Sequence, residues 1–324
     1  MGIVFGLLAA FGWGLGDYFI TCLTRRVGTA RAMIYAQVCS LLAWVVLLIL
    51  PSQLLWGRDS VALWGGLREF EGGVPVWVWA AGAGLCHVLG LVLSYRAFEI
   101  GTLALVSPLA SSFAVVTAVL SLSTRRDVLP PHILIGAGIL FCGIVVATRA
   151  PSHPDELNKG LRGVPEALGC AVGFGVMFWM MEPLDKHLGP VVPLIVLKLM
   201  ATASALISFA AARNSPEMPA PEPVVPENEA ARPAWHLVGA LAAGIAIVDS
   251  LAWLAFNNGE RLQFTTVVTS LASLFSVVTI LLAWLLLKER LARVQWIGIA
   301  VILLGVLLVS VPKEAIDHIL RPNG

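Results

Sequence analysis

Residues 109–117 read LASSFAVVT, and residues 271–279 read LASLFSVVT. Further matches lie on both sides of this stretch in the same order: Gly136 with Gly298, Gly143 with Gly305, Ala97-Phe98 with Ala255-Phe256, and AFGWG at 10–14 with AVGFG at 171–175. Such an ordered series of matches with shared glycines is hard to obtain from apolar composition alone, so the sequence predicts two similar halves.

The composition places the chain in a membrane. Only 13% of the 324 residues are charged, about half the ~25% expected of a soluble domain, while 58% are hydrophobic and the mean hydropathy is +0.86. The net charge is +1, so nothing suggests nucleic-acid binding, which would need a basic stripe. Five cysteines fall inside apolar runs without metal-ligand spacing, so neither a metal site nor a cofactor is expected.

An all-α integral membrane protein with ten transmembrane helices is the predicted fold. A bilayer core of about 30 Å needs about 20 apolar residues per helix, and only helices satisfy the backbone there without strand pairing. The ten apolar runs are Gly2–Cys22, Ala32–Leu50, Val76–Ala97, Leu103–Leu122, Ile133–Thr148, Val164–Met181, Val191–Ala211, Trp235–Phe256, Thr265–Leu287 and Val294–Val311.

The repeat divides these ten spans into two groups of five. The first five-helix repeat covers residues 1–150, a connecting loop covers 151–162, and the second repeat covers 163–324. The second repeat contains a proline-rich acidic loop at about 214–233, which we expect to be disordered. A second long loop covers 51–75 and is expected to lie along the membrane interface. Five is odd, so the second repeat enters the membrane from the opposite face, which gives the inverted repeats typical of secondary transporters.

The C-terminal stretch Ala255–Ser310, with KERL at 288–291 before WIGIA at 296–300, resembles the EamA domain of the drug/metabolite transporter (DMT) superfamily. The first half looks like a second copy. The resemblance implies a ten-helix basket with a central cavity lined by the first four helices of each half, the fifth serving packing or dimer contact. It also implies transport of small metabolites, often export. The loops at 51–75 and 214–233 depart from the compact family pattern.

Ionisable side chains inside apolar helices are costly and indicate functional sites. The predicted spans contain five: Asp17, His87, Glu182, Lys198 and Asp249. Asp17 lies one turn after Trp13, and Asp249 lies one turn before Trp253. A buried carboxyl group without a partner favours its neutral form, which suits a proton-coupled step, whereas beside Lys198 it would act as a fixed counter-ion. The sequence leaves both possibilities open.

Each of the other three has a structural alternative. Glu182 precedes Pro183 and either faces the cavity or reaches the interface. Lys198 either contacts substrate or pairs with Asp249, and His87 is either a ligand or proton group or a satisfied helix contact.

Aromatic and hydroxyl side chains complete the predicted substrate site. Trp13, Tyr18, Trp179 and Trp253 are candidates for an aromatic cavity wall, which together with carboxylates would suit an ammonium group. Ser111 and Ser273 occupy equivalent positions in the fourth and ninth predicted helices, and either line the pathway or bond back to their own helix. The predicted substrate-binding residues are therefore Trp13, Asp17, Tyr18, His87, Ser111, Trp179, Glu182, Lys198, Asp249, Trp253 and Ser273.

We expect a multi-pass protein of the cell (inner) membrane whose partners are a small-molecule substrate, possible protons and the lipid bilayer, with a homodimer as one option.

The orientation in the membrane has two conflicting signals. Lysine and arginine are more numerous in the loops on the face opposite the termini, which favours termini outside. The resemblance implies cytoplasmic termini, and we follow the family.

The predicted function is secondary active transport of a small organic metabolite by alternating access, proton-coupled and directed outward. Two alternatives are an enzyme acting on lipid or isoprenoid substrates and a non-transporting receptor or scaffold. The sequence has no HExxH, no GxSxG and no histidine cluster, which disfavours the enzyme. A scaffold has no need of two exchangeable halves.

Overall fold

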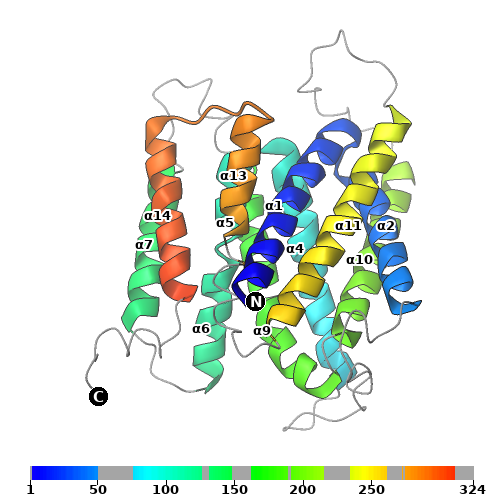
Figure 1. The fold of residues 1–324 in the computed structure, drawn as a ribbon, viewed down its shortest axis with the longest axis horizontal. Coiled ribbons are helices and arrows are strands. Elements are labelled where there is room, and N and C mark those ends of the chain that lie inside the picture. The colour runs from blue at the N-terminus through cyan, green and yellow to red at the C-terminus, as the bar shows by residue number, and fades with distance from the viewer. Residues whose placement is uncertain are drawn as a thin grey trace.

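The computed structural model describes residues 2–49, 76–125, 131–147, 162–188, 191–214, 234–260, 272 and 274–310. The predicted loop at 51–75 lies outside these residues, as does nearly all of the predicted loop at 214–233 and of the connection at 151–162. The described part is helical and contains no strand (Figure 1). Its helices are α1 (Gly2–Val27), α2 (Thr29–Ile49), α4 (Val76–Ile100), α5 (Leu103–Ala110), α6 (Phe113–Arg125), α7 (Pro131–Ala147), α9 (Val164–Leu188), α10 (Val192–Asn214), α11 (Trp235–Glu260), α13 (Phe275–Leu285) and α14 (Arg293–Ser310).

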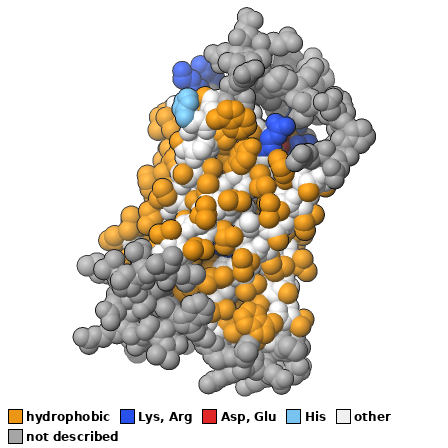
Figure 2. Space-filling view, turned by 90° about the vertical axis from the view of Figure 1, so that its right-hand side faces the viewer, with side chains coloured by type: hydrophobic (Ala, Val, Ile, Leu, Met, Phe, Trp, Pro, Cys, Tyr) orange, Lys and Arg blue, Asp and Glu red, His pale blue; other side chains and the backbone are white. Residues whose placement is uncertain are grey.

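Six of the described helices are long and apolar enough to cross a membrane, by length and composition: α1, α2, α4, α9, α10 and α11. Shorter apolar helices coincide with the other four predicted spans. Large hydrophobic side chains on α2, α10 and α11 are exposed, among them Leu42, Ile207 and Leu251. Figure 2 shows hydrophobic side chains spread over the middle of this face, with basic side chains and a histidine near its upper end. This surface is suited to lipid contact, so the protein is a multi-pass membrane protein.

Helices α1 and α9 run through the molecule in opposite directions. Arg25, near the end of α1, donates from Nε to the Phe98 carbonyl at 3.3 Å and from Nη2 to the Gly101 carbonyl at 2.9 Å, both at the C-terminal end of α4. Gly163, just before α9, lies at the same place, because a Cβ there would be 2.8 Å from the Ala97 carbonyl oxygen. The end of α1 and the start of α9 therefore meet at one end of α4.

The contacts of α1 are repeated by α9 on the other side of the core. A Cβ added at Gly14 in α1 would lie 2.6 Å from Val278 Cβ in α13, and one at Gly175 in α9 would lie 2.5 Å from Val116 Cβ in α6. Gly14 and Gly175 are matched in the sequence repeat, and so are Val278 and Val116. In the same way α1 of the first half packs on α11 of the second half, and α9 of the second half packs on α4 of the first.

Helices α7 and α14 pack against each other at one end of the long axis of the molecule (Figure 1). A Cβ at Gly143 would lie 2.6 Å from the Ile302 nitrogen, and one at Gly305 would lie 2.6 Å from the Leu140 nitrogen. The two glycines let the backbones touch, and they are equivalent in the repeat. The two predicted fifth helices thus pack on each other.

The predicted span Leu103–Leu122 corresponds to two consecutive helices, α5 and α6, with a turn at Ser111–Ser112 between them. Pro108 has no N–H to continue the helical ladder. The Ser111 hydroxyl donates to the Pro108 carbonyl at 2.8 Å, and the Ser112 hydroxyl donates to the Leu109 carbonyl at 2.6 Å. These side-chain bonds compete with the helix for its carbonyl groups, so the turn falls at Ser111–Ser112.

Candidate functional site

A cavity of about 150 Å³ lies among helices of both halves. This is room for several water molecules or one small organic molecule. The described lining residues come from α1, α2, α4, α5 and α6 of the first half and from α9, α10, α11 and α13 of the second, and none of them belongs to α7 or α14. Six predicted site residues line it: Trp13, Asp17, His87, Lys198, Asp249 and Trp253.

Asp17 is held by hydroxyl groups from both halves. The Ser107 hydroxyl of α5 donates to Asp17 Oδ2 at 2.9 Å, and the Thr279 hydroxyl of α13 lies 3.0 Å from the same oxygen. Among the described side chains, Asp17 forms no ion pair. Hydroxyl groups both donate and accept, so they can accommodate either an ionised or a protonated Asp17.

The Thr279 hydroxyl has more acceptors than protons. Its Oγ1 lies 3.1 Å from the Phe275 carbonyl oxygen and 3.4 Å from that of Gly14, in addition to Asp17 Oδ2. A hydroxyl has one proton and can serve only one of these acceptors fully. A proton on Asp17 removes the conflict, because the carboxyl group then donates to Thr279 Oγ1 and the threonine donates to a carbonyl.

Lys198 of α10 and Asp249 of α11 form an ion pair inside the cavity wall. Lys198 Nζ lies 2.5 Å from Asp249 Oδ2, and the two side chains are 7% and 22% exposed. The pairing that the sequence left as one of two options is therefore present. Breaking such a buried pair by removing one partner typically costs about 3–5 kcal/mol, because a charge is left uncompensated.

His87 presents unpartnered ring nitrogens to the cavity. The residue is 7% exposed, and among the described residues neither Nδ1 nor Nε2 has a hydrogen-bond partner. Its ring lies 5.7 Å from the ring of Phe174 at an interplanar angle of 35°. A buried imidazole normally finds a partner, so the two nitrogens are available to a ligand in the cavity.

Aromatic rings form another part of the cavity wall. Phe113 stacks on Phe178 with ring centroids 4.9 Å apart, and Phe178 stacks on Trp253 at 5.9 Å. Trp13 meets Trp253 edge to face at 5.3 Å, and Phe275 lies 6.2 Å from Phe113. The wall thus carries side chains from both halves and offers flat apolar surface to a ligand.

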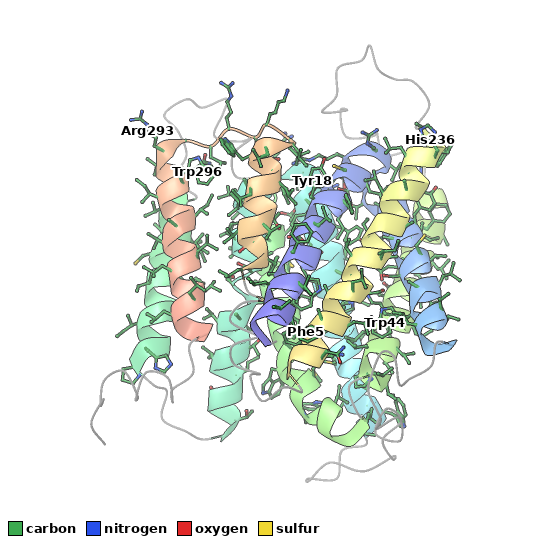
Figure 3. The ribbon with its side chains drawn as sticks, in the orientation of Figure 1. Phe5, Tyr18, Trp44, His236, Arg293 and Trp296 are labelled. Carbon is green, nitrogen blue, oxygen red and sulfur yellow. The ribbon has the colours of Figure 1, made fainter. Side chains whose placement is uncertain are left out.

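Three predicted site residues lie outside the cavity lining. Tyr18 packs beside Phe19 on α1 (Figure 3), with centroids 5.9 Å apart. Trp179 lies 5.4 Å from Trp79, and its Nε1 donates to the Thr124 hydroxyl at 3.3 Å. Ser111 is fully buried and bonds back to its own helix.

Two other predicted residues are not placed. Ser273 lies outside the described residues, and so does the side chain of Glu182.

Several lining residues were not predicted from the sequence. Gln37 is a polar residue within an apolar run, a signal that was available, and its buried Oε1 has no partner in the part of the chain that the structure describes. Phe113 and Phe275 belong to the repeated segment itself, but their aromatic character did not distinguish them from core residues. The other unpredicted residues include Ser40, Ser94, Tyr95, Phe98, Phe174 and Phe178.

A charged cluster lies at the end of the molecule where α1 finishes. Arg25 Nη2 is 2.8 Å from Glu289 Oε1, and Glu289 also accepts from the backbone nitrogens of Leu103 at 3.1 Å and Ala104 at 2.9 Å. Glu289 therefore satisfies the free N–H groups at the start of α5. Arg293 and His236 mark the same end of the molecule on α14 and α11 (Figure 3).

These features define a polytopic helical membrane protein with a mixed polar and aromatic cavity between two similar groups of helices. The profile of the EamA-like transporter family matches residues 161–311. This segment is a domain of the drug/metabolite transporter superfamily, and the family indicates a membrane transporter of that type. The resemblance found in the sequence is confirmed for this segment, and its family consists of transporters rather than enzymes.

A solved structure titled "Crystal structure of protein" has the same fold, with a TM-score of 0.56 and 19% sequence identity. The comparison covers 95% of this chain and 94% of the other. At this identity the likeness concerns the fold alone. A comparison with curated proteins finds no match.

Proposed function

We propose that the protein is a secondary active transporter that exports a small organic metabolite by alternating access, coupled to protons. The two five-helix repeats would be inverted with respect to each other, and their relative movement would open the cavity to one side of the membrane and then to the other. The proposed site of action is the cell (inner) membrane.

The opposite directions of α1 and α9 support the inverted repeat. The contacts of Gly14 with Val278 and of Gly175 with Val116 support it further. In each contact a glycine of one half meets a valine of the other, and the two contacts use matched positions of the repeat, so exchanging the halves turns one contact into the other. The cavity lies where these two sets of helices face each other, which is where alternating access needs a substrate site.

The observation that carries the proton coupling is the position of Asp17. It belongs to one half, and its carboxylate is bound by Ser107 of the same half and by Thr279 of the other. A change in its charge therefore alters a contact between the halves. Since the two hydroxyls accommodate either protonation state, a proton can be taken up here without loss of all hydrogen bonds.

The test uses the purified full-length protein in sealed liposomes containing a pH-sensitive dye. A panel of amino acids, amines, nucleosides and sugars is added with and without an imposed pH gradient, and protein-free liposomes serve as the blank. We expect at least one compound to move and to change the internal pH. In Asp17→Asn this response to the gradient should disappear.

Two outcomes would count against the proposal. Movement of the compound that does not respond to any imposed gradient rejects proton coupling, and a full gradient response in Asp17→Asn removes the role of Asp17. Direction is tested separately, by adding the compound to one side of liposomes in which the orientation of the protein is known.

A further inference from the structure

The ion pair of Arg25 and Glu289 joins the two halves of the chain. Arg25 Nη2 lies 2.8 Å from Glu289 Oε1, and the two side chains are 25% and 11% exposed. In Figure 1 the end of α1 and the connection from α13 to α14 lie together at the upper end of the molecule. The other ion pairs among the described side chains lie within α4 and between α10 and α11, so each stays within one half. A movement that parts the halves at this end must therefore break the Arg25–Glu289 pair.

This ion pair lies directly beyond one end of the cavity. Phe98 lines the cavity, and its carbonyl oxygen accepts from Arg25 Nε at 3.3 Å. Ile20 of α1 lines the cavity as well, and Leu23, between Ile20 and Arg25, is fully buried. The ion pair is therefore on the outer side of the packed side chains that end the cavity here.

A second contact between the halves lies at the same end. Gly101 follows α4 in the first half, and Gly163 precedes α9 in the second half. A Cβ added at Gly101 would lie 2.8 Å from the Arg162 carbonyl oxygen, and one added at Gly163 would lie 3.1 Å from Gly101 Cα. The two backbones touch, so no solute can pass between these segments while the halves stay in this arrangement.

Glu289 is fixed to α13 by the way in which that helix ends. Its backbone N–H donates to the Ala283 carbonyl at 3.2 Å, and Lys288 before it has a φ of 55°, the left-handed conformation in which helices commonly end. The Glu289 carboxylate accepts from the backbone nitrogens of Leu103 and Ala104 at the start of α5. A shift of α13 therefore carries Glu289 with it and changes its contacts with the first half.

The segments that meet at this ion pair are also the segments that meet at Asp17. Asp17 and Arg25 lie about two turns apart on α1. Ser107, which donates to Asp17, belongs to α5, and α5 is buried along its whole length. Thr279, the other hydroxyl at Asp17, belongs to α13. The ion pair and the carboxyl group inside the cavity are thus attached to the same three helical segments.

We infer that the Arg25–Glu289 pair is a latch, which holds the cavity closed at this end of the molecule and breaks when the cavity opens there. The inference rests on the proposed function in taking alternating access as given. It adds where one of the two closures lies and which side chains hold it. Arg25 retains 25% exposure, so water can replace Glu289 as its partner when the halves part. We call this end of the molecule the latch end.

The test measures access to Cys170, a native residue that lines the cavity and is fully buried. It lies within the first two turns of α9, which starts at the latch end. The full-length protein keeps Cys170, and the other native cysteines are replaced by alanine: Cys22, Cys39, Cys86 and Cys142. A membrane-impermeant maleimide is added outside sealed liposomes or trapped inside them, and the rate of labelling is measured from each side.

The orientation of the protein in the liposomes is measured with the same reagent. Arg290 is exposed and follows Glu289 directly, so Arg290→Cys in a chain without other cysteines reports how many molecules have the latch end outward. The labelling rates of Cys170 are then assigned to the latch end and to the opposite end.

Two variants remove the ion pair. Glu289→Gln keeps an amide oxygen for the start of α5 and loses the charge, and Arg25→Gln loses the guanidinium. In each variant, labelling of Cys170 from the latch end should rise about tenfold, as expected for the loss of one hydrogen bond between charged groups. Labelling from the opposite end should stay the same or fall, because alternating access opens the cavity to one side at a time.

Arg96→Gln is the matched control. It breaks an ion pair with Glu99 that lies within α4 and does not join the halves, so both labelling rates should stay unchanged.

Equal increases from both ends would show a general loosening and overturn the latch. Unchanged labelling from the latch end in either variant would overturn it as well. Flux in the same liposomes distinguishes this failure from that of the proposed function. Transport of a compound without a latch-end effect on labelling leaves transport standing and rejects the latch, whereas the one-sided labelling change without flux of any compound does the reverse.

Discussion

Arg25 at the end of α1 and Glu289 between α13 and α14 are joined by a 2.8 Å ion pair that links the two halves of the chain. Glu289 also caps the start of α5 through two backbone nitrogens. One carboxylate thus ties together three segments that are far apart in the sequence.

Glu289→Ala should therefore destabilise the protein. Two backbone N–H groups and a partly buried guanidinium lose their acceptor, which we expect to cost about 1–3 kcal/mol in the free energy of unfolding. The measurement is thermal unfolding in detergent. The exposed neighbour Arg290 supplies the control, since Arg290→Ala should change stability by less than about 0.5 kcal/mol. Equal unfolding temperatures for the two variants would contradict the capping role.

Gly14→Ala and Gly175→Ala should destabilise to a similar extent. The added methyl group would lie 2.7 Å from the Phe275 carbonyl oxygen in the first case and 2.9 Å from that of Phe113 in the second, so backbone must move. Overpacking of this kind costs about 1–3 kcal/mol. Gly138→Ala, where no atom of the described residues lies within 4 Å of the added Cβ, should be neutral or slightly stabilising. If Gly138→Ala is as harmful as the other two, close packing is not the cause.

Thr279→Val should shift the pH dependence of transport. Loss of a hydroxyl that donates to the ionised Asp17 disfavours the charged form, so the midpoint of the pH–rate profile moves to higher pH. Hydrogen bonds to charged groups are worth about 1.5–3 kcal/mol and one pH unit corresponds to about 1.4 kcal/mol, so the shift should be about one to two units.

Thr117→Val is the matched control for that experiment. Thr117 is the equivalent residue of the first half, and its hydroxyl bonds to the Gly175 carbonyl at 2.9 Å and to no carboxylate. Its replacement should lower stability without moving the midpoint. Equal shifts in both variants would show that the effect comes from helix packing.

Trp253→Phe and Trp179→Phe should have different effects on ligand binding. Trp253 lines the cavity and loses part of its aromatic contact, which at about 0.5–1.5 kcal/mol corresponds to roughly 2- to 10-fold weaker binding of a compound that the liposome panel shows to be transported. Trp179 packs on Trp79 away from the lining, so its replacement should affect stability and leave the affinity unchanged. Calorimetric titration of the two variants measures the binding affinity. Weaker binding in Trp179→Phe would show that Trp179 belongs to the binding site.

The sequence was sufficient for the membrane class and for most of the ionisable side chains that line the cavity. Charges in apolar helices are rare and costly, so Asp17, His87, Lys198 and Asp249 stood out, and all four line the cavity. Tryptophans gave a weaker signal, because indole rings serve packing and interface contacts equally well. Trp13 and Trp253 line the cavity, whereas Trp179 does not.

Features that depend on packing between distant helices were not accessible from one sequence. Ser107 and Thr279 approach Asp17 only because α5, α13 and α1 meet, and the phenylalanines of the wall look like any other core residue until the helices are assembled. The division of the Leu103–Leu122 run is a local effect of Pro108, Ser111 and Ser112, where side-chain bonds replaced a continuous helix.

The contact between α7 and α14 limits how the rest of the molecule can rearrange. At Gly143 of α7 and at Gly305 of α14 the missing side chain lets the backbone of the other helix approach closely, and these two contact points are displaced along the helices. If one helix slid along the other, side chains would collide with the backbone at both contact points at once. A small rotation of one helix against the other about their line of contact would not cause this collision. In the alternating access proposed above, this pair would therefore serve as a pivot about which the two halves tilt while the contact between α7 and α14 stays closed.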